Sequence, residues 1–192
     1  MEEHARAAWD RRYREGSHSS FKPDPFFVSA YREFIAPSFP QGGSALDVAG
    51  GVGRHAIFLA QRGWQVTLLD ISSAALEQAS KEARNRGLRI TTQQADLTAT
   101  PLPVSAFDLV VDFFYLERPL FPQIEAALRP GGLVVFRTYT REQLKLGGGP
   151  THPMHLLESN ELLRAFGGMA ILHYHESVKD KAIAELVARK PG

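Results

Sequence analysis

Three carboxylates and a glycine cluster are the residues of this sequence whose types and spacing can do chemistry. Asp47 precedes glycines at positions 50, 51 and 53, and Asp70 and Asp96 follow further along the chain. Each carboxylate lies at or near the end of an apolar segment that predicts a strand, which is where open α/β sheets bind ligands. Carboxylates accept hydrogen bonds from hydroxyl and amino groups, and glycines let a backbone approach a ligand closely. This pattern predicts a site for a nucleotide-like cofactor.

Alternating strands and helices position these residues. Apolar runs predict strands over 45–49, 65–70, 89–95, 107–113 and 132–139. Helical patterns cover 2–15, 25–35, 53–62, 73–86 and 119–128. Gly63 and Gly87 stand where helices should stop, Ser72 stands at an N-cap position, and Pro25 suits the start of a helix. Regular alternation of this kind predicts a parallel sheet with helices on both faces.

The pattern changes after Tyr139. Residues 146–157 form a segment rich in Gly, Pro and His, and a short helix opened by Ser159 or Asn160 follows. Residues 170–177 and 181–190 predict an antiparallel hairpin, although the second segment alone is also compatible with a helix. The fold class expected is therefore α/β, Rossmann-like and doubly wound, with a mostly parallel sheet and an antiparallel C-terminal hairpin.

Composition limits the classes of protein that remain. The 192 residues, 44% hydrophobic and 22% charged, predict one soluble domain, and a net charge of +1 implies no general attraction to nucleic acid or membrane. The absence of cysteine excludes disulfides and thiolate catalysis. Neither a secretory signal nor a run of about 20 apolar residues is evident. We therefore expect a cytoplasmic protein, either a monomer or a homodimer.

Two cofactors are compatible with the glycine cluster. Residues 51–56 match the dinucleotide pattern GxGxxA, and Asp70 lies at a suitable distance for a ribose hydroxyl. However, Asp47 would stand beside a negatively charged pyrophosphate, and the chain has neither a Tyr-xxx-Lys pair nor a second catalytic domain. The phosphate-binding GxxxxGK[ST] pattern is also missing. These observations disfavour NAD and exclude a P-loop nucleotide.

S-adenosylmethionine fits better because it lacks phosphates and carries cationic groups. Asp47 can attract its ammonium group, and Gly51 and Gly53 admit its methionine part. The start of the following helix, with Arg54 or His55 nearby, suits its carboxylate. The remaining expected cofactor contacts lie at later strand ends: Asp70 on the ribose, Ile71 on the adenine face, and Asp96 with Leu97 near the adenine amine. For Asp96 taken alone, a turn or helix cap remains the alternative.

The run ALDVAGGVGRHAIFLAQRGWQVTLLDIS, followed by ADL, FDLVVD and LRPGGLVVFRT, resembles class I S-adenosylmethionine-dependent methyltransferases over residues 44–140. The resemblance implies a seven-stranded sheet of order 3-2-1-4-5-7-6 whose last strand is antiparallel. The acidic-x-Gly-x-Gly-x-Gly loop of that family maps onto Asp47, Ala49, Gly51 and Gly53, with Gly50 inside it. Ala49 replaces the usual first glycine, and its small methyl group should be tolerated.

WDRRYREG, PDPFF and GPTHPMHLLESNELLRAF resemble the narrower tellurite-resistance-type and thiopurine-type branch. The resemblance implies that an N-terminal segment covers the cofactor, with Trp9, Arg12 and Tyr13 as the matching residues. Packing in the core is the alternative for Trp9 and Tyr13. The expected single domain thus comprises a helical cap or lid over 1–40, a cofactor-binding core over 44–140, and a substrate-side loop with the terminal hairpin over 141–192.

Methyl transfer requires alignment and exclusion of water more than a dedicated base, and no residue is singled out as catalytic. Asp112 and Phe113 lie at the expected ligand edge. Phe113, Phe114 and Tyr115 can line an apolar acceptor pocket, although ordinary core is the alternative for these aromatics. His152 and His155 are expected near that pocket rather than on a metal, because no suitably spaced carboxylate accompanies them. No metal is expected.

The sequence therefore predicts methyl transfer from S-adenosylmethionine to a small-molecule acceptor, with S-adenosylhomocysteine as product and with no nucleic-acid or membrane partner. Two alternatives remain at this point. One is an NAD(P)-binding reductase, and the other is a non-catalytic module that keeps the cofactor fold. The methyl-accepting atom cannot be identified from these residues.

Overall fold

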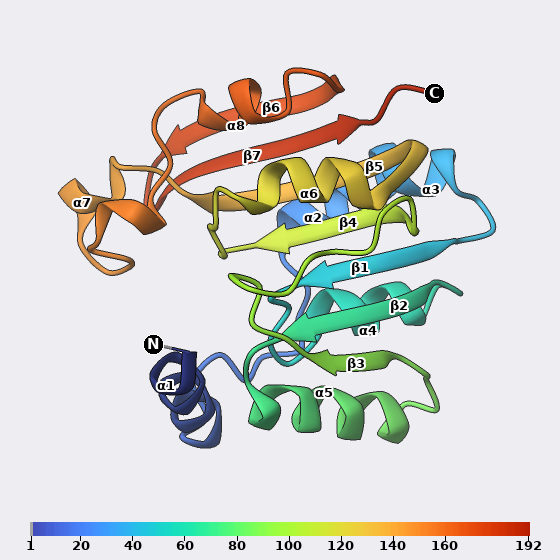
Figure 1. The fold of residues 1–192 in the computed structure, drawn as a ribbon, viewed down its shortest axis with the longest axis vertical. Coiled ribbons are helices and arrows are strands. Elements are labelled where there is room, and N and C mark those ends of the chain that lie inside the picture. Colours follow the sequence, from blue (N-terminus) through green and yellow to red (C-terminus); the bar gives the residue numbers. More distant parts are fainter. Residues whose placement is uncertain (1) are drawn as a thin grey trace. The chain divides into compact units, whose positions relative to one another are not determined.

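The apolar runs of the sequence form a seven-stranded sheet in the computed structural model, which describes residues 2–192, with side chains from residue 4 onward. The strand order is β3-β2-β1-β4-β5-β7-β6, which confirms the expected order (Figure 1). β1, β2 and β3 pair in parallel, as do β4 and β5, whereas β7 runs antiparallel to both β5 and β6. The strands are β1 (Ser44–Val48), β2 (Gln65–Asp70), β3 (Thr91–Gln94), β4 (Phe107–Phe113), β5 (Leu128–Tyr139), β6 (Ala170–Val178) and β7 (Ala182–Arg189).

Helical segments lie between most of these strands. They are α1 (Glu2–Arg14), α2 (Pro25–Ala30), the π-helical η1 (Tyr31–Ile35), α3 (Ala36–Ser38), α4 (Arg54–Ala60), α5 (Ser73–Asn85), α6 (Leu120–Ala127), α7 (Gln143–Leu146), the 3-10 turn η2 (Pro153–His155) and α8 (Glu161–Ala165). Two start signals in the sequence are confirmed. Asp24 caps α2 by accepting from the Phe26 amide at 2.9 Å with Pro25 at the first position, and Ser72 caps α5 by accepting from the Ala75 amide at 3.2 Å.

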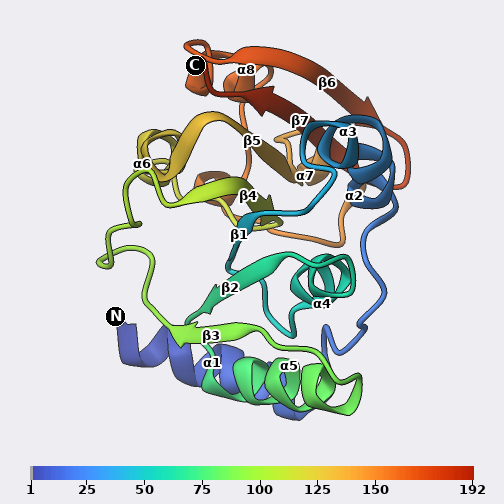
Figure 2. The same ribbon diagram turned by 90° about the vertical axis from the view of Figure 1, so that its right-hand side faces the viewer.

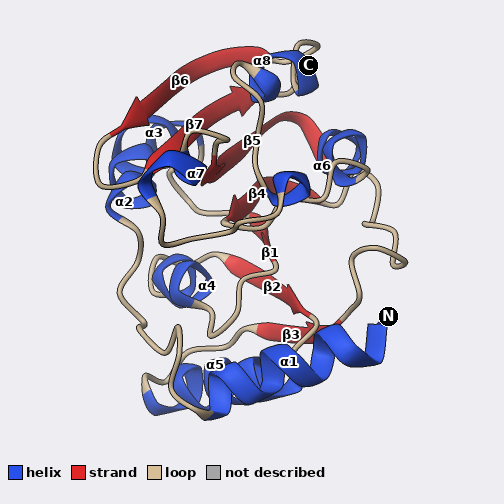
Figure 3. Ribbon diagram, turned by 90° about the vertical axis from the view of Figure 1, so that its left-hand side faces the viewer, coloured by secondary structure: helices blue, strands red, loops and turns tan. Residues whose placement is uncertain are grey.

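The chain divides into two compact units, residues 1–101 and 102–192. In the first unit, α4 packs on β1 and β2, while α5 packs on β2 and β3 (Figure 2). α1 lies alongside α5, as Figure 3 shows in blue. The buried core of this unit includes Leu46, Ile57, Leu59 and Leu68, none of which is more than 1% exposed.

The second unit contains β4, β5, β7 and β6, with α6 packed on β4 and β5. Nearly every residue of β4 and β7 is buried, and for β4 the apolar run LVVDFF is typical of a strand covered on both faces. Phe121, Phe136 and Phe166 pack together in this core, with ring centroids 5.6 to 6.1 Å apart. The segment Ala182–Arg189 is a strand, which resolves the open choice between strand and helix at the end of the chain.

Some boundaries differ from the sequence-based expectation. β3 covers only Thr91–Gln94 and is therefore shorter than the predicted strand over 89–95. Its residues are mostly exposed. β5 begins at Leu128, where the helix predicted for 119–128 has already ended, and a register irregularity lies between Phe107 and Leu109 on the neighbouring strand. The Gly/Pro/His-rich segment is not a plain loop, because it contains η2 (Pro153–His155). Among the described residues, no helix combines the length and the apolar character needed to span a membrane.

Candidate functional site

A tight loop of left-handed backbone joins β1 to α4. Ala49, Gly51 and Gly53 have φ values of 48°, 57° and 76°, and the Gly53 amide donates to the Gly50 carbonyl at 3.0 Å. Position 50 requires a glycine for another reason, because an added Cβ would collide with Leu68 and with the Asp47 carboxyl group. The loop therefore brings backbone close to the end of β1, as the glycine spacing predicted.

Asp47 lies directly beneath this loop and is 1% exposed. Its Oδ2 atom accepts from the Ala56 amide at 3.1 Å, and its Oδ1 atom accepts no hydrogen bond although it is buried. Burial raises the pKa of Asp47 to about 7, against the opposing effects of the Ala56 amide and the positive charge of Arg54. A buried oxygen of this kind is stabilised by a cation or another donor placed next to it.

The two basic candidates at the start of α4 differ. Arg54 is half-buried, and its charge acts on Asp47. His55 is 2% exposed, and burial holds its pKa well below the usual value, so its ring is neutral. Its Nε2 atom accepts from the Asp24 amide at 3.4 Å, and its ring packs on Phe27 at 4.7 Å. Arg54 is therefore the cation at this helix start, while His55 joins α4 to the segment before α2.

Asp70 ends β2 and holds the glycine loop in place. Its Oδ2 atom accepts from the Gly51 amide and its Oδ1 atom from the Ser72 amide, both at 2.8 Å. The side chain is buried, and burial raises its pKa in spite of these hydrogen bonds. A carboxylate has about four acceptor positions, so capacity remains for hydroxyl groups of a ligand.

The remaining cofactor candidates of this unit lie at the ends of β2 and β3. Gln94 donates from Nε2 to the Ile71 carbonyl at 3.0 Å, which ties the two strand ends together. Asp96 forms a turn with Thr98, accepting from its amide at 2.9 Å and its hydroxyl at 2.7 Å. The next residue, Leu97, is buried. Asp96 thus stabilises a turn, which was the alternative to cofactor binding for this residue. Both hydrogen bonds of the turn go to its Oδ1 atom.

α1 covers the glycine loop through Tyr13. A Cβ added at Gly51 would collide with the Tyr13 hydroxyl, so the phenol lies directly over this glycine. The Tyr13 ring is buried with Val52, Ala74 and Ala75, and burial together with the charge of Asp70 raises its pKa. Trp9 packs against the same cluster. Its indole lies 6.0 Å from the Tyr13 ring, and the guanidinium of Arg12 lies 4.8 Å from the indole.

Sequence reasoning missed the residue that attaches α1. Asp10 is buried and accepts from the Ser72 hydroxyl at 2.6 Å, the Ala74 amide at 3.0 Å and the Ser73 hydroxyl at 3.3 Å. Burial alone would raise the pKa of Asp10, but the hydrogen bond from Ser72 and then that from Ala74 hold it below its usual value. Asp10 therefore supplies a second cap for α5 from a distant part of the chain.

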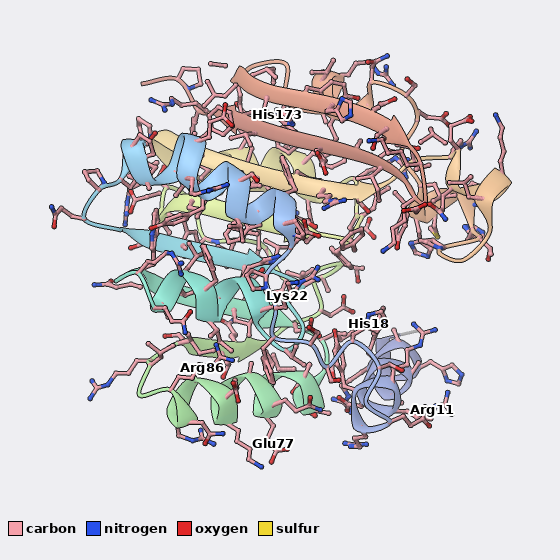
Figure 4. All side chains as sticks on the ribbon, turned by 180° about the vertical axis from the view of Figure 1, so that it is seen from behind. Arg11, His18, Lys22, Glu77, Arg86 and His173 are labelled. Carbon is pink, nitrogen blue, oxygen red and sulfur yellow. The ribbon has the colours of Figure 1, made fainter. Side chains whose placement is uncertain are left out.

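The segment after α1 completes this attachment. Gln78 on α5 donates to the Tyr13 carbonyl at 3.1 Å. His18, which Figure 4 labels close to Arg11 of α1, places its ring 6.0 Å from Trp9 and 6.4 Å from Tyr13. Arg86, labelled at α5 in the same view, has its guanidinium 6.0 Å from the Phe21 ring. The N-terminal segment is therefore attached to the rest of its unit at separate points, while residues 14–20 are exposed.

The other predicted residues belong to the second unit. Asp112 and Phe113 are buried at the end of β4, and Asp112 pairs in register with Phe136 of β5. Tyr115 is half-buried in the segment after β4. His152 and His155 are exposed around η2, with ring centroids 6.0 Å apart. The His152 Nδ1 atom accepts from the Met154 amide at 3.3 Å.

An arginine that the sequence did not single out fixes the histidine segment. Arg118 forms an ion pair with Glu161 at 2.6 Å and donates to the Met154 and Leu156 carbonyls at 2.9 and 3.0 Å. The Glu161 carboxylate also accepts from the Glu158 amide at 2.8 Å. Arg118 thereby attaches the segment that carries both histidines to the segment after β4. Within the described part of the chain, no group of three or more His, Cys, Asp or Glu is arranged to hold a metal ion.

Comparisons with known proteins identify the class of this site. Residues 45–132 match the methyltransferase domain family. The tRNA 5-carboxymethoxyuridine methyltransferase of Escherichia coli (strain K12) is 30% identical over 118 residues, which cover 57% of this chain and 45% of that protein. Probable thiol methyltransferase 2 of Arabidopsis thaliana is 25% identical over 181 residues, covering 89% of this chain and 77% of that protein.

Solved structures agree on the fold. TehB from Haemophilus influenzae has a TM-score of 0.73 at 17% identity, over 93% of this chain and 66% of that one. Residues 45–132 thus match a methyltransferase domain, and the solved structures show the fold of class I S-adenosylmethionine-dependent methyltransferases that the sequence predicted. They give no support to an NAD(P)-binding reductase. The chain spans less than half the length of the tRNA methyltransferase it matches.

S-adenosylmethionine is accordingly the cofactor of this domain, and the residues at the glycine loop fit it. The Asp47 Oδ1 atom, buried without a hydrogen bond, suits an ammonium group. A Cβ added at Gly53 would press on Leu68 at 3.1 Å and on Ala79 at 3.2 Å, so this glycine serves the packing of the loop, whereas the Tyr13 hydroxyl lies over Gly51. A cofactor entering this loop must therefore share it with Tyr13 or displace it.

Proposed function

We propose that this protein transfers the methyl group of S-adenosylmethionine to a small-molecule acceptor and releases S-adenosylhomocysteine. The observation that carries the proposal is the buried Asp47 Oδ1 atom, which accepts no hydrogen bond beside a loop of left-handed glycines. An NAD pyrophosphate would repel this carboxylate, whereas an ammonium group would pair with it.

Each site residue contacts a different part of the cofactor in this proposal. Asp47 binds the ammonium group, and Arg54 with the first amides of α4 binds the carboxylate. Asp70 accepts from the ribose hydroxyls with the acceptor capacity that its two backbone hydrogen bonds leave. Ile71 covers the adenine, while Asp96 and Leu97 contact its edge.

The bound cofactor supplies an activated methyl group, and the protein has to align the acceptor and exclude water. Tyr115, His152 and His155 are the acceptor-side candidates, and Arg118 holds the two histidines in position. No general base is assigned. We include a cytoplasmic location in this proposal, which agrees with a sequence that contains no cysteine.

Calorimetry with S-adenosylmethionine and S-adenosylhomocysteine tests the cofactor role. We expect micromolar binding, about −8 kcal/mol, and no comparable binding of NADH. Asp47→Asn is the matched variant, because the amide can still accept from Ala56 while its NH₂ group repels an ammonium ion. Binding of NADH alone, or equal binding by Asp47→Asn, would show that the proposal is wrong.

Transfer from isotope-labelled cofactor across small thiols, amines, carboxylates and metalloid oxyanions tests the acceptor class. A transfer RNA arm is needed, because one relative is named for a tRNA substrate. The likeness to a protein named as a probable thiol methyltransferase is the reason to test small acceptors first. Methylation of tRNA with none of the small acceptors would overturn the small-molecule assignment.

The N-terminal segment acts as the cover of the cofactor in this proposal. Tyr13 lies over Gly51. Asp10 on α1 and Gln78 on α5 make the hydrogen bonds that attach the segment to α5. A cover attached by a few polar contacts can open to release product and close to shield the reaction. Trp9 and Arg12 extend the same face of the cover.

Limited proteolysis tests the cover. S-adenosylhomocysteine should protect residues 2–24 and shift the fluorescence of Trp9, with Trp64 as the only other tryptophan. Asp10→Ala should expose the segment to protease, whereas Arg14→Ala is the control, because Arg14 is 69% exposed and contacts Asp10 only at 3.8 Å. If ligand leaves digestion unchanged and deletion of residues 2–20 chiefly lowers the melting temperature, the segment is ordinary core.

A further inference from the structure

Two aromatic rings and a lysine gather at one edge of the second unit. Phe114 follows β4, Tyr139 ends β5, and Lys181 immediately precedes β7. Because β4 and β5 are parallel and β7 is antiparallel to β5, all three residues come to the same edge. The Phe114 and Tyr139 ring centroids lie 5.1 Å apart, and the Lys181 Nζ atom lies 5.6 Å and 5.9 Å from them.

Phe114 holds its ring there at a cost in backbone energy. Its φ is 65°, a conformation that a bulky side chain rarely adopts, and its amide donates to the Arg137 carbonyl at 2.7 Å. Backbone strain of this kind persists where surrounding structure enforces it, and it concentrates at functional sites. The surroundings of Phe114, including the hydrogen bond to Arg137, therefore enforce the position of this ring.

The charges around the rings are unequal. The Arg137 guanidinium lies 5.7 Å from the Phe114 ring, but Glu185 neutralises it at 3.3 Å. His173, labelled on β6 in Figure 4, approaches the same carboxylate at 4.0 Å. Lys181 is exposed, and within the part of the chain that the structure describes it forms no ion pair with a carboxylate. The uncompensated charge beside the two rings is therefore positive.

We propose that Phe114, Tyr139 and Lys181 form a subsite for a planar organic anion, whose carboxylate pairs with Lys181 while its flat body stacks on the two rings. This inference rests on the proposed function, because it assigns the anion as the methyl acceptor. Flat π-systems stack on exposed aromatic faces, and a lysine ammonium adds a charge-assisted hydrogen bond to a carboxylate. A cationic acceptor is disfavoured here by repulsion from Lys181.

Ligand-observed NMR with benzoate and benzamide, a pair of equal shape and different charge, tests the subsite in the full chain. We expect benzoate to bind at least about fivefold more tightly than benzamide, since only the anion pairs with Lys181. Lys181→Gln should remove this preference, and Lys181→Arg should keep it. Lys179→Gln is the matched control, because Lys179 is exposed on the same hairpin and makes no contact with either ring.

Two further measurements separate this inference from its premises. Calorimetry should show equal binding of S-adenosylhomocysteine by the wild type and by Lys181→Gln. If neither protein binds it, the proposed function is refuted, and the preference for benzoate over benzamide still decides whether the subsite exists. Melting temperatures report whether Lys181 only braces the hairpin. Equal binding of benzoate and benzamide by the wild type, or a preference that survives in Lys181→Gln, would overturn the subsite.

Discussion

The strand ends of the two units present different groups to a ligand. At the ends of β1 and β2, the carboxylates of Asp47 and Asp70 are buried and accept from backbone amides of the loop and of α4. At the ends of β4 and β5, Phe114, Tyr139 and Lys181 are partly or fully exposed and contact one another through side chains. At the first edge the groups are held by hydrogen bonds to backbone amides, and at the second edge they contact one another through their side chains.

This difference matches two recognition tasks. A cofactor has a constant structure, so a loop fixed by amides and left-handed glycines can fit it closely. An acceptor requires groups that differ from one enzyme to another, and side chains at strand ends can change without disturbing the sheet. Substitutions at the first edge should therefore lower stability and cofactor binding together, whereas those at the second should change acceptor binding alone.

The largest effect is expected from Gly51→Ala. The new methyl group would require a left-handed backbone and would collide with the Tyr13 hydroxyl. We expect a loss of about 2 kcal/mol in the free energy of unfolding and about a hundredfold weaker binding of S-adenosylhomocysteine. Gly87→Ala is the control, because Gly87 has a φ of +68° and nothing within 4 Å. If the two variants behave alike, the contact with Tyr13 has no consequence for the site.

Asp70→Asn should affect both quantities by smaller amounts. An amide cannot accept at both of its terminal atoms, so either the Gly51 or the Ser72 N–H group loses its partner. We expect about 1–2 kcal/mol lower stability and about 2 kcal/mol weaker cofactor binding, measured by denaturation and calorimetry. Asp96→Asn, in a surface turn, should change stability less. A destabilised Asp70→Asn that binds cofactor normally would mean that Asp70 serves the loop and not the ribose.

The raised pKa of Asp47 implies that the stability of the fold falls with rising pH while the affinity for the cofactor increases. Burial raises its pKa from 3.8 to about 7, so stability present at low pH is lost as the pH rises toward 7. An ammonium group favours the ionised carboxylate, so S-adenosylhomocysteine should bind about tenfold more tightly at pH 8 than at pH 6. Calorimetry across this range checks the slope, which Asp47→Asn should abolish. A flat profile in the wild type would separate Asp47 from the ammonium group.

The smallest effect on stability is expected from Phe114→Gly. Glycine removes the strain of a φ of 65°, a gain of about 1 kcal/mol. It loses the contact between the rings, about 1 kcal/mol, and the apolar surface that the half-buried ring keeps from water, about 1 kcal/mol more. The free energy of unfolding should therefore fall by only about 1 kcal/mol, while benzoate binding is lost. Ser105→Gly, at a φ of 48°, relieves strain without removing a ring and should only stabilise. A large destabilisation by Phe114→Gly would make the ring a structural element.

The sequence predicts the first edge well because its constraints are local. The order of strands follows from alternation and from the resemblance, and Ser72 and Pro25 mark helix starts through constraints that act over a few positions at most. The glycine loop is recognisable for the same reason, since a left-handed turn leaves few residue choices at each position.

The second edge is not readable in this way. Phe114, Tyr139 and Lys181 are far apart in the chain, and nothing near Phe114 in the sequence signals a left-handed phenylalanine. The ion pair of Arg118 with Glu161 and the cap that Asp10 gives to α5 also join distant positions, with separations of 43 and 64 residues. Such contacts depend on the assembled fold, so charge and spacing alone did not identify them.

The cap from Asp10 also has a consequence for the order of folding. α1 is synthesised before α5, yet the Ala74 amide that Asp10 binds lies 64 residues later in the chain. α1 can therefore dock only after β1, the glycine loop and β2 have emerged and α5 has begun to form, because a contact of that separation closes a long loop. The covering helix thus leaves the ribosome before the helix on which it docks, and it can close over the glycine loop only once that helix is present.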